Sequence, residues 1–252
     1  MRNFESNRVE VLEFQDDSTI RTLYCELRKS KRARRLNLRL KSPTHALLTF
    51  PYRMSWQVAE DFLSKQKSWL QQKSLEFPPF LSLKQHFSRG GEICLNQTLQ
   101  ERTVRIIENC SNDRPRVSLE NQEIGIYINA GKKDDVQIKQ VCRKLACQFL
   151  PGWTEWAADQ VGLFPKKVRI GDQRTRWGSC SPKGTLSLNW RIILLPKELG
   201  SYVIFHELAH LAQMNHSQKF WQKLEEFVPN AKAVDRKLTK DGKVIFSLGR
   251  SG

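Results

Sequence analysis

Hydrophobic and polar residues alternate in several short runs along the first half of the chain. Residues 36–40 (LNLRL) have the period of two that is typical of a half-buried strand, and ALLTF at 46–50 follows after a short turn. Between residues 55 and 73 the spacing becomes that of an amphipathic helix, which the prolines of FPPF end. Four more strand-like runs follow, GEICL at 91–95, TVRII at 103–107, RVSL at 116–119 and EIGIYI at 123–128. The first half is therefore predicted to be β-rich with one helix.

The second half of the chain has longer helical patterns. Apolar residues recur at helical spacing from Val141 to Trp156, and Pro151-Gly152 inside this stretch predicts a kink or two consecutive helices. Strand-like runs lie at 166–170 and at 185–195, and the last strong helix is expected from about 198 to 214. The small, polar and charged segment NAGKKDD at 129–135 is typical of a domain boundary. We predict an α+β protein with a β-rich N-terminal region, residues 1–130, and a C-terminal α+β domain, residues 131–252.

The composition is that of a folded protein. Hydrophobic residues make up 39% and charged residues 27% of the 252 residues, which argues against disorder. No apolar run approaches the ~20 residues of a membrane-spanning helix, and the N-terminus has no signal-peptide stretch, so we expect a cytoplasmic protein without a membrane partner. Six cysteines without a C-x-x-C pair favour reduced thiols over a disulfide framework; they are Cys25, Cys94, Cys110, Cys142, Cys147 and Cys180.

The chain carries a strong excess of positive charge, with a net charge of +16. Its densest basic run, RKSKRARRLNLRLK from Arg28 to Lys41, has eight basic residues and no acidic one. Such a surface attracts polyanions through counterion release and predicts nonspecific nucleic-acid binding. A basic face that only keeps the protein in solution is the alternative, and the sequence leaves both open.

The segment FHELAHLAQMNH contains three histidines within eleven residues. In a helix, His206 and His210 are one turn apart on the same face, so both imidazoles can reach one metal ion. Glu207 completes an H-E-x-x-H pattern, in which the glutamate is the general base for a metal-bound water. His216 follows an asparagine that can end the helix, and a chain folding back there would supply a third ligand. The alternative, histidines that only satisfy hydrogen bonds in the core, accounts less well for the third histidine.

The block HELAHLAQMNHSQKFW, preceded by RTRWGSC at 174–180, resembles the YgjP-like metallopeptidase family, relatives of the SprT-like and WLM zinc peptidases. RRLNLRL, from Arg34 to Leu40, resembles the RR-x-L-x-L-R stretch of the β-rich N-terminal segment in that family, so the resemblance covers nearly the whole chain. It implies a zincin-like C-terminal domain, Zn²⁺ held by His206, His210 and His216, a catalytic Glu207, and a peptide or protein substrate.

A zinc peptidase mechanism follows from these residues. Zinc with three protein ligands keeps one position open for a water molecule and lowers the pKa of that water. Glu207 would accept its proton during attack on the carbonyl carbon and pass the proton to the leaving amine. Glu225 and Glu226 are candidates to orient the imidazoles. The run TLSLNW at 185–190 is a candidate edge strand that aligns the substrate as an added strand.

RTRWGSC offers further candidate residues beside this site. Arg174 and Arg176 are candidates to bind carboxylates or phosphates of the substrate, and pairing with Asp172 or with backbone carbonyls is the structural alternative. Gly178 is expected to relax a tight turn and Trp177 to pack beneath the active helix. Cys180 fits a buried small hydrophobe better than a nucleophile or a ligand.

Three functions compete at this point. A zinc metallopeptidase accounts best for the histidines and the glutamate. A metal-dependent nucleotide (UTP-type) pyrophosphatase would use the same metal with basic residues, but the chain has no acidic cluster for Mg²⁺ and no glycine-rich phosphate loop. A nucleic-acid-associated peptidase would use the basic run, although the spaced Cys/His pairs of a zinc finger and the RNP aromatic motif are absent from the sequence.

Overall fold

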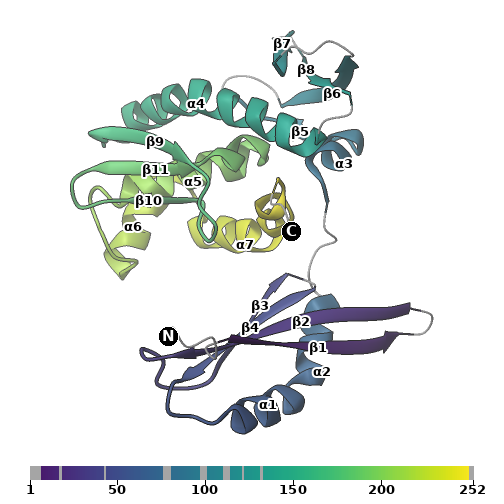
Figure 1. The fold of residues 1–252 in the computed structure, drawn as a ribbon. Coiled ribbons are helices and arrows are strands. Elements are labelled where there is room, and N and C mark those ends of the chain that lie inside the picture. Colours follow the sequence, from purple (N-terminus) through teal and green to yellow (C-terminus); the bar gives the residue numbers. More distant parts are fainter. Residues whose placement is uncertain are drawn as a thin grey trace, which may run out of the picture. The chain divides into compact units, whose positions relative to one another are not determined.

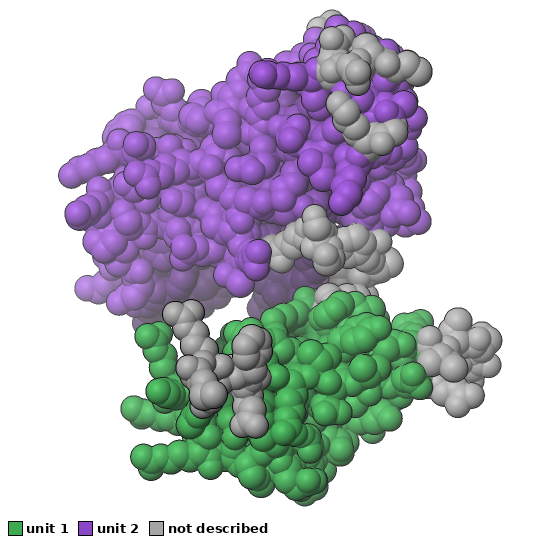
Figure 2. Space-filling model, in the orientation of Figure 1, with its two compact units in different colours: residues 1–79 green, residues 80–252 purple. Residues whose placement is uncertain are grey.

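The chain folds into two compact units, residues Met1–Pro79 and Phe80–Gly252 (Figure 2). The computed structural model describes residues 7–16, 19–42, 44–75, 81–96, 101–109, 114–120, 122–130 and 133–249. Each unit has its own hydrophobic core. No helix in these ranges is long and apolar enough to cross a membrane. The five cysteines in them carry free thiols, and Cys110 lies outside them.

The first unit is a four-stranded sheet with two helices on one face (Figure 1). The strand order is β1-β2-β4-β3, in which β2 and β4 are parallel and the other pairs antiparallel. The elements are β1 (Asn7–Asp16), β2 (Thr19–Ser30), β3 (Asn37–Ser42), β4 (His45–Pro51), α1 (Trp56–Lys65) and α2 (Lys67–Leu75). The predicted strands at 36–40 and 46–50 are β3 and β4. The single helix expected over 55–73 is divided at Gln66.

The second unit contains two sheets. In the first sheet the order is β5-β6-β8-β7, and in the second it is β10-β11-β9, with β6/β8 and β11/β9 as the parallel pairs. The strands are β5 (Glu92–Ile93), β6 (Arg102–Asn109), β7 (Arg116–Leu119), β8 (Glu123–Asn129), β9 (Lys167–Gly171), β10 (Gly178–Cys180) and β11 (Thr185–Asn189). Each of the six strand-like runs predicted in this part of the chain contains a strand, but the second part of the run at 185–195 forms a 3-10 helix, Trp190–Leu194.

A long helix joins the two sheets into one core. The helices are α3 (Leu83–Ser88), α4 (Asp134–Val161), the 3-10 helix η1 (Trp190–Leu194), α5 (Lys197–Ala209), α6 (Gln218–Phe227) and α7 (Ala231–Ser247). α4 packs against β8, β9, η1 and α5. Figure 1 shows the length of α4 beside β9. Pro151 lies inside α4. The helix continues through this residue, so the alternative of two consecutive helices is not observed. The architecture is mixed α+β, as the sequence predicts.

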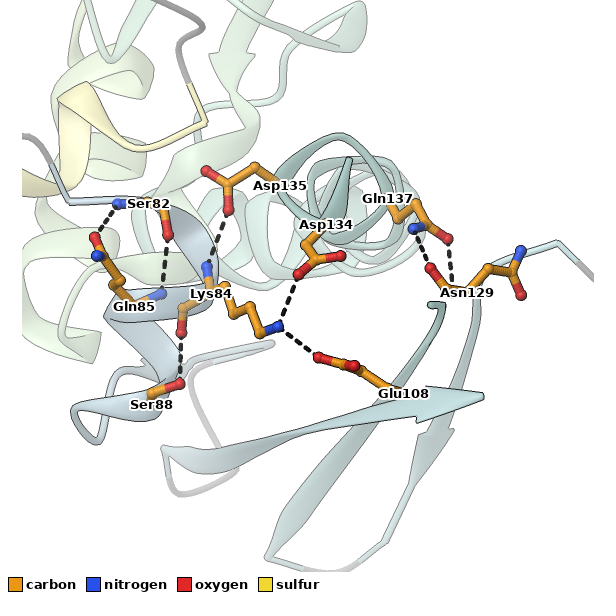
Figure 3. A network of polar contacts seen from close by, with 9 residues as sticks. All are labelled: Ser82, Lys84, Gln85, Ser88, Glu108, Asn129, Asp134, Asp135 and Gln137. Carbon is orange, nitrogen blue, oxygen red and sulfur yellow. Dashed lines mark hydrogen bonds and ion pairs between the residues drawn. The ribbon is translucent and has the colours of Figure 1, made fainter. Parts of the chain in front are cut away.

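The division between the units lies at Pro79, not at residues 130 and 131. Residues 81–130 belong to the second unit because polar side chains tie them to the start of α4 (Figure 3). The Asp135 carboxylate accepts hydrogen bonds from the first two backbone N–H groups of α3, at 3.0 and 3.1 Å. The Lys84 ammonium pairs with Glu108 of β6 and Asp134 of α4. The acidic end of NAGKKDD therefore caps a neighbouring helix and is no linker.

An ion pair between a buried arginine and a partly exposed aspartate fixes the end of α7 to the core of the second unit. Arg191 of η1 is fully buried, and its guanidinium pairs with Asp172 and donates from Nε to the Leu248 carbonyl at 2.7 Å. Asp172 also accepts from Lys139 of α4 at 2.8 Å and from the indole N–H of Trp190 at 3.1 Å. Asp172 thus holds η1, α4 and the segment after β9 together.

Candidate metal centre and active site

The histidine segment lies at the C-terminal end of α5, which is buried along most of its length. A helix that is apolar all round is typical of a core position. Packing on all sides fixes the directions in which the side chains of its last turn point. His206 and Glu207 are in that last turn, and His210 is the C-cap residue. The helix ends at Ala209 and continues as turns, so it is shorter than the predicted range of 198–214. The partial negative charge at a helix C-terminus favours a cation there.

The structure brings the three predicted histidines together. His206, His210 and His216 each offer one nitrogen, and these nitrogens lie within 4.8 Å of one another. The Nε2 atoms of His206 and His216 are 3.0 Å apart. Phe220 of α6 is fully buried, and its ring centroid lies 5.0, 4.6 and 4.7 Å from those of His206, His210 and His216. Phe220 therefore holds all three rings against one hydrophobic side, a role that the sequence pattern did not reveal.

Hydrogen bonds on the far side of two rings orient their free nitrogens inward. His210 Nδ1 lies 3.0 Å from the Gln213 carbonyl oxygen, which can only accept, so the proton is on Nδ1 and the lone pair on Nε2. The Tyr202 hydroxyl donates to Asp235 of α7 at 2.9 Å. Its oxygen can therefore accept from His206 Nδ1, at 3.3 Å. Asp235 therefore helps to orient an imidazole, the role that was expected of Glu225 or Glu226. Both glutamates are exposed on α6.

The charge state of the histidines suits metal binding. Burial, together with the neighbouring His210 and His216, lowers the pKa of His206 to about 3. Burial also lowers the pKa of His210. Both rings are therefore neutral at neutral pH, which is the form of imidazole that binds a metal. Two nitrogens bound to one tetrahedral zinc, each ~2.0–2.1 Å from it, are about 3.3 Å apart. The donors present fit that ion.

Glu207 lies beside the histidines in a buried position. Its side chain is 6% exposed, and its Oε2 atom has no hydrogen-bond partner among the described residues. Burial raises the pKa of Glu207 to about 8, while the Arg176 charge acts to lower it. A buried carboxylate of this kind is a candidate for proton transfer near neutral pH, once a nearby cation favours its ionised form.

Gly178 of β10 makes room for Glu207. A Cβ atom at Gly178 would lie 2.6 Å from both Cγ and Oε1 of Glu207. The backbone of Gly178 is not left-handed, so the reason for glycine here is this close approach and not the relaxed turn that was expected. Trp177 contacts α7, where its ring packs edge-on against Phe246 with centroids 4.8 Å apart.

The site opens into a pocket of about 450 Å³. Its lining residues come from β10, α5, α7 and the turns around them: Arg176, Trp177, Gly178, Ser179, Cys180, Tyr202, Val203, His206, Glu207, His210, Met214, His216, Asp235 and Leu238. Of the two arginine candidates, only Arg176 is among these described lining residues. Arg174 is exposed and is not among these lining residues. Asp172, which was considered as a partner for the two arginines, pairs instead with Arg191 and Lys139.

The edge of the sheet at the pocket is β10. β11, the candidate edge strand of the sequence analysis, pairs with β10 on one side and β9 on the other, so it has no free edge. That expectation was wrong, and β10 is the edge strand instead. Cys180 at the end of β10 is half-buried. Its burial, and to a smaller extent the negative charge of Glu207, raise the pKa of its thiol. A thiol that keeps its proton is a poor nucleophile, which favours the packing interpretation.

Comparison with known proteins identifies the family. No curated protein matches the chain. Among solved structures, the crystal structure of the metallopeptidase zymogen of Pyrococcus abyssi abylysin is 35% identical over 34% of this chain and 90% of that chain, with a TM-score of 0.31. A family model described as YgjP-like, metallopeptidase domain matches residues 34–241, most of the chain. The chain therefore belongs to the YgjP-like metallopeptidase family.

Proposed function

We propose that this protein is a zinc-dependent peptidase, with zinc held by His206, His210 and His216 and with Glu207 as the general base. The observation that carries the proposal is the convergence of these four side chains on one pocket. Membership of a metallopeptidase family supports the reaction class. The α+β domain around the H-E-x-x-H helix would then be zincin-like.

The metal assignment rests on the chemistry of the donors. Three imidazole nitrogens without a thiolate or a carboxylate suit zinc, and three protein ligands are typical of a catalytic zinc site. Zinc bound there would act as a Lewis acid, which makes water more acidic and polarises the carbonyl of the substrate. Asp235 and the Gln213 carbonyl, through their hydrogen-bonded contacts, would keep the rings turned toward the ion.

Glu207 would move the proton in the reaction. Its carboxylate would take a proton from the attacking water and deliver it to the nitrogen of the leaving amine. The buried position excludes bulk water from this carboxylate, and contact with Gly178 fixes the side chain. A positive metal charge nearby would bring its pKa down from the value that burial alone imposes, so that the ionised base is populated at neutral pH.

The substrate is proposed to be an extended peptide. Among the described strands β10 pairs only with β11, which leaves its other edge free beside Glu207, and an extended peptide could pair with that edge as an added strand. Arg176 lines the same pocket and would bind a carboxylate of the substrate. A pyrophosphatase is favoured less, because the candidate metal group found among the described residues is the histidine set and contains no carboxylate.

Metal analysis tests the proposal. Protein purified without added metal should contain about one zinc per chain by elemental analysis. The double variant His206→Ala/His210→Ala should lose it. His45→Ala removes an exposed histidine of the first unit and should keep the zinc. Full zinc occupancy in the double variant would show that these histidines are not the ligands.

A further inference from the structure

Five cationic side chains gather at one end of the sheet in the first unit. Four are exposed in the loop between β2 and β3 and one follows β4: Lys31, Arg32, Arg34, Arg35 and Arg53. The sheet register brings them together, because Ser30 at the end of β2 pairs with Pro51 at the end of β4. The Tyr52 N–H donates to the Ser30 carbonyl at 3.1 Å, which fixes the next residues. We call these five side chains and Tyr52 the cationic end.

The charges of the cationic end are not neutralised within the described part of the chain. None of the five forms an ion pair there. The basic run from Arg28 to Lys41 is in fact divided, because Glu26 on the open face of the sheet pairs with Arg28 at 2.7 Å and with Lys41 at 3.6 Å. Unpaired like charges at close spacing repel one another, and a polyanion would relieve this repulsion.

The kind of cation indicates phosphate. Four of the five are arginines, whose planar guanidinium groups can bind a phosphate through two parallel hydrogen bonds. A face that served only to keep the protein in solution would have no need of that geometry, since a lysine carries the same charge.

An aromatic ring lies among these cations. Tyr52 is 52% exposed, although a tyrosine can bury a large apolar area. The Lys29 and Lys31 ammonium groups lie 5.8 and 6.0 Å from its ring centroid. Lys29 also lies 5.0 Å from the ring of Trp56, so the cations and rings form one continuous surface. An exposed ring beside cationic side chains is typical of surfaces on which nucleic-acid bases stack.

We propose that the cationic end binds single-stranded nucleic acid without sequence preference. The arginines bind successive phosphates, and Tyr52 stacks on one base. An unpaired strand is required, because a base within a duplex has no free face for the ring. This inference does not depend on the zinc site, since all of its residues belong to the first unit.

Fluorescence anisotropy with the full-length chain tests the proposal. A labelled single strand of roughly 16 nucleotides, titrated at several salt concentrations, gives both the affinity and its salt dependence. The triple variant Arg32→Gln/Arg34→Gln/Arg35→Gln should reduce the log–log salt slope by about 2, since each single-strand phosphate contact contributes about 0.7. Tyr52→Ala should weaken single-strand binding by about 5- to 150-fold, as expected for one stacked base, and leave binding to a duplex of the same sequence unchanged.

A matched control separates the cationic end from the overall charge. Lys166→Gln/Lys167→Gln/Arg169→Gln removes the same number of exposed charges at β9 in the second unit and should leave affinity and slope near those of the wild type. An equal loss of binding in this control would show that binding depends only on the net charge of the protein, and this would overturn the proposal. No single-strand binding at about 50 mM salt, or equal effects of Tyr52→Ala on single strand and duplex, would also overturn it.

Discussion

Substitution of Gly178 by alanine probes the contact on which the position of Glu207 depends. The new methyl carbon would lie 2.6 Å from Cγ and from Oε1 of Glu207, whereas nonbonded carbon contacts are about 3.5–4.0 Å. The carboxylate must therefore move by about 1 Å, and a buried side chain has few ways to do so. A displacement of that size at a reacting group can lower the rate by about 10²-fold.

The expected result is a variant that keeps its metal and loses its activity. None of the three histidines is touched, so zinc content should stay at the level of the wild type, and overpacking should lower the free energy of unfolding by about 1–3 kcal/mol. The assays are peptide hydrolysis, elemental analysis and urea denaturation on the same preparation. Gly152→Ala is the control, because a Cβ at Gly152 meets nothing within 4 Å.

A double variant sharpens this prediction. Glu207→Ala removes Cγ and the carboxylate, which are the atoms that the new methyl group would meet. Gly178→Ala should therefore lower the free energy of unfolding less in the Glu207→Ala background than in the wild type. Equal effects in both backgrounds, or wild-type activity within a factor of two for Gly178→Ala with zinc retained, would refute the argument that Gly178 positions Glu207.

Two further predictions concern side chains behind the site. Asp235→Asn weakens the acceptor that orients Tyr202 toward His206, so zinc affinity measured by chelator competition should fall by about 10- to 100-fold, and an unchanged affinity would argue against this role. Although burial acts to raise it, hydrogen bonds from Lys139 and Arg191 hold the pKa of Asp172 well below its usual range. The stabilisation from Asp172 is therefore complete above the unfolded pKa of about 3.9 and disappears as the pH falls toward the folded pKa. Asp172→Asn should lower the free energy of unfolding by about 3 kcal/mol at pH 7, and by less at pH 3, in urea denaturation.

The sequence predicted the metal-site candidates because their spacing is local. His206 and His210 are one helical turn apart whatever the surroundings, and the segment after them is short enough for His216 to return. Asp235 and Gly178 act on the same site from distant parts of the chain. Nothing in their own neighbourhood distinguishes them from other acids and glycines, so only the folded structure reveals their contacts.

The domain boundary shows how a local pattern can mislead. The polar segment at 129–135 resembles a linker in composition, but Asp134 and Asp135 bind Lys84 and the start of α3. The sequence pattern does not predict β1 and β2, for another reason. RVEVLEF at 8–14 does alternate, but charged residues occupy positions on both faces, since Arg8 of β1 pairs with Glu60 of α1. Whether such a polar segment is a linker or a helix cap depends on the residues that it contacts, and its own sequence does not reveal them.

Peptide hydrolysis by Glu207→Gln, measured alongside its zinc content, tests the central claim most directly. The amide keeps the size of the side chain but cannot accept the proton, and Glu207 is proposed as a base and not as a ligand. A peptide-library digest of the wild type first identifies a cleaved sequence, and nucleoside triphosphates are assayed in parallel. The account predicts about one zinc per chain in both proteins and a loss of peptide cleavage of ~10²–10⁴-fold in the variant. Peptide cleavage within a factor of two of the wild type, or Glu207-dependent release of pyrophosphate without any peptide cleavage, would contradict it.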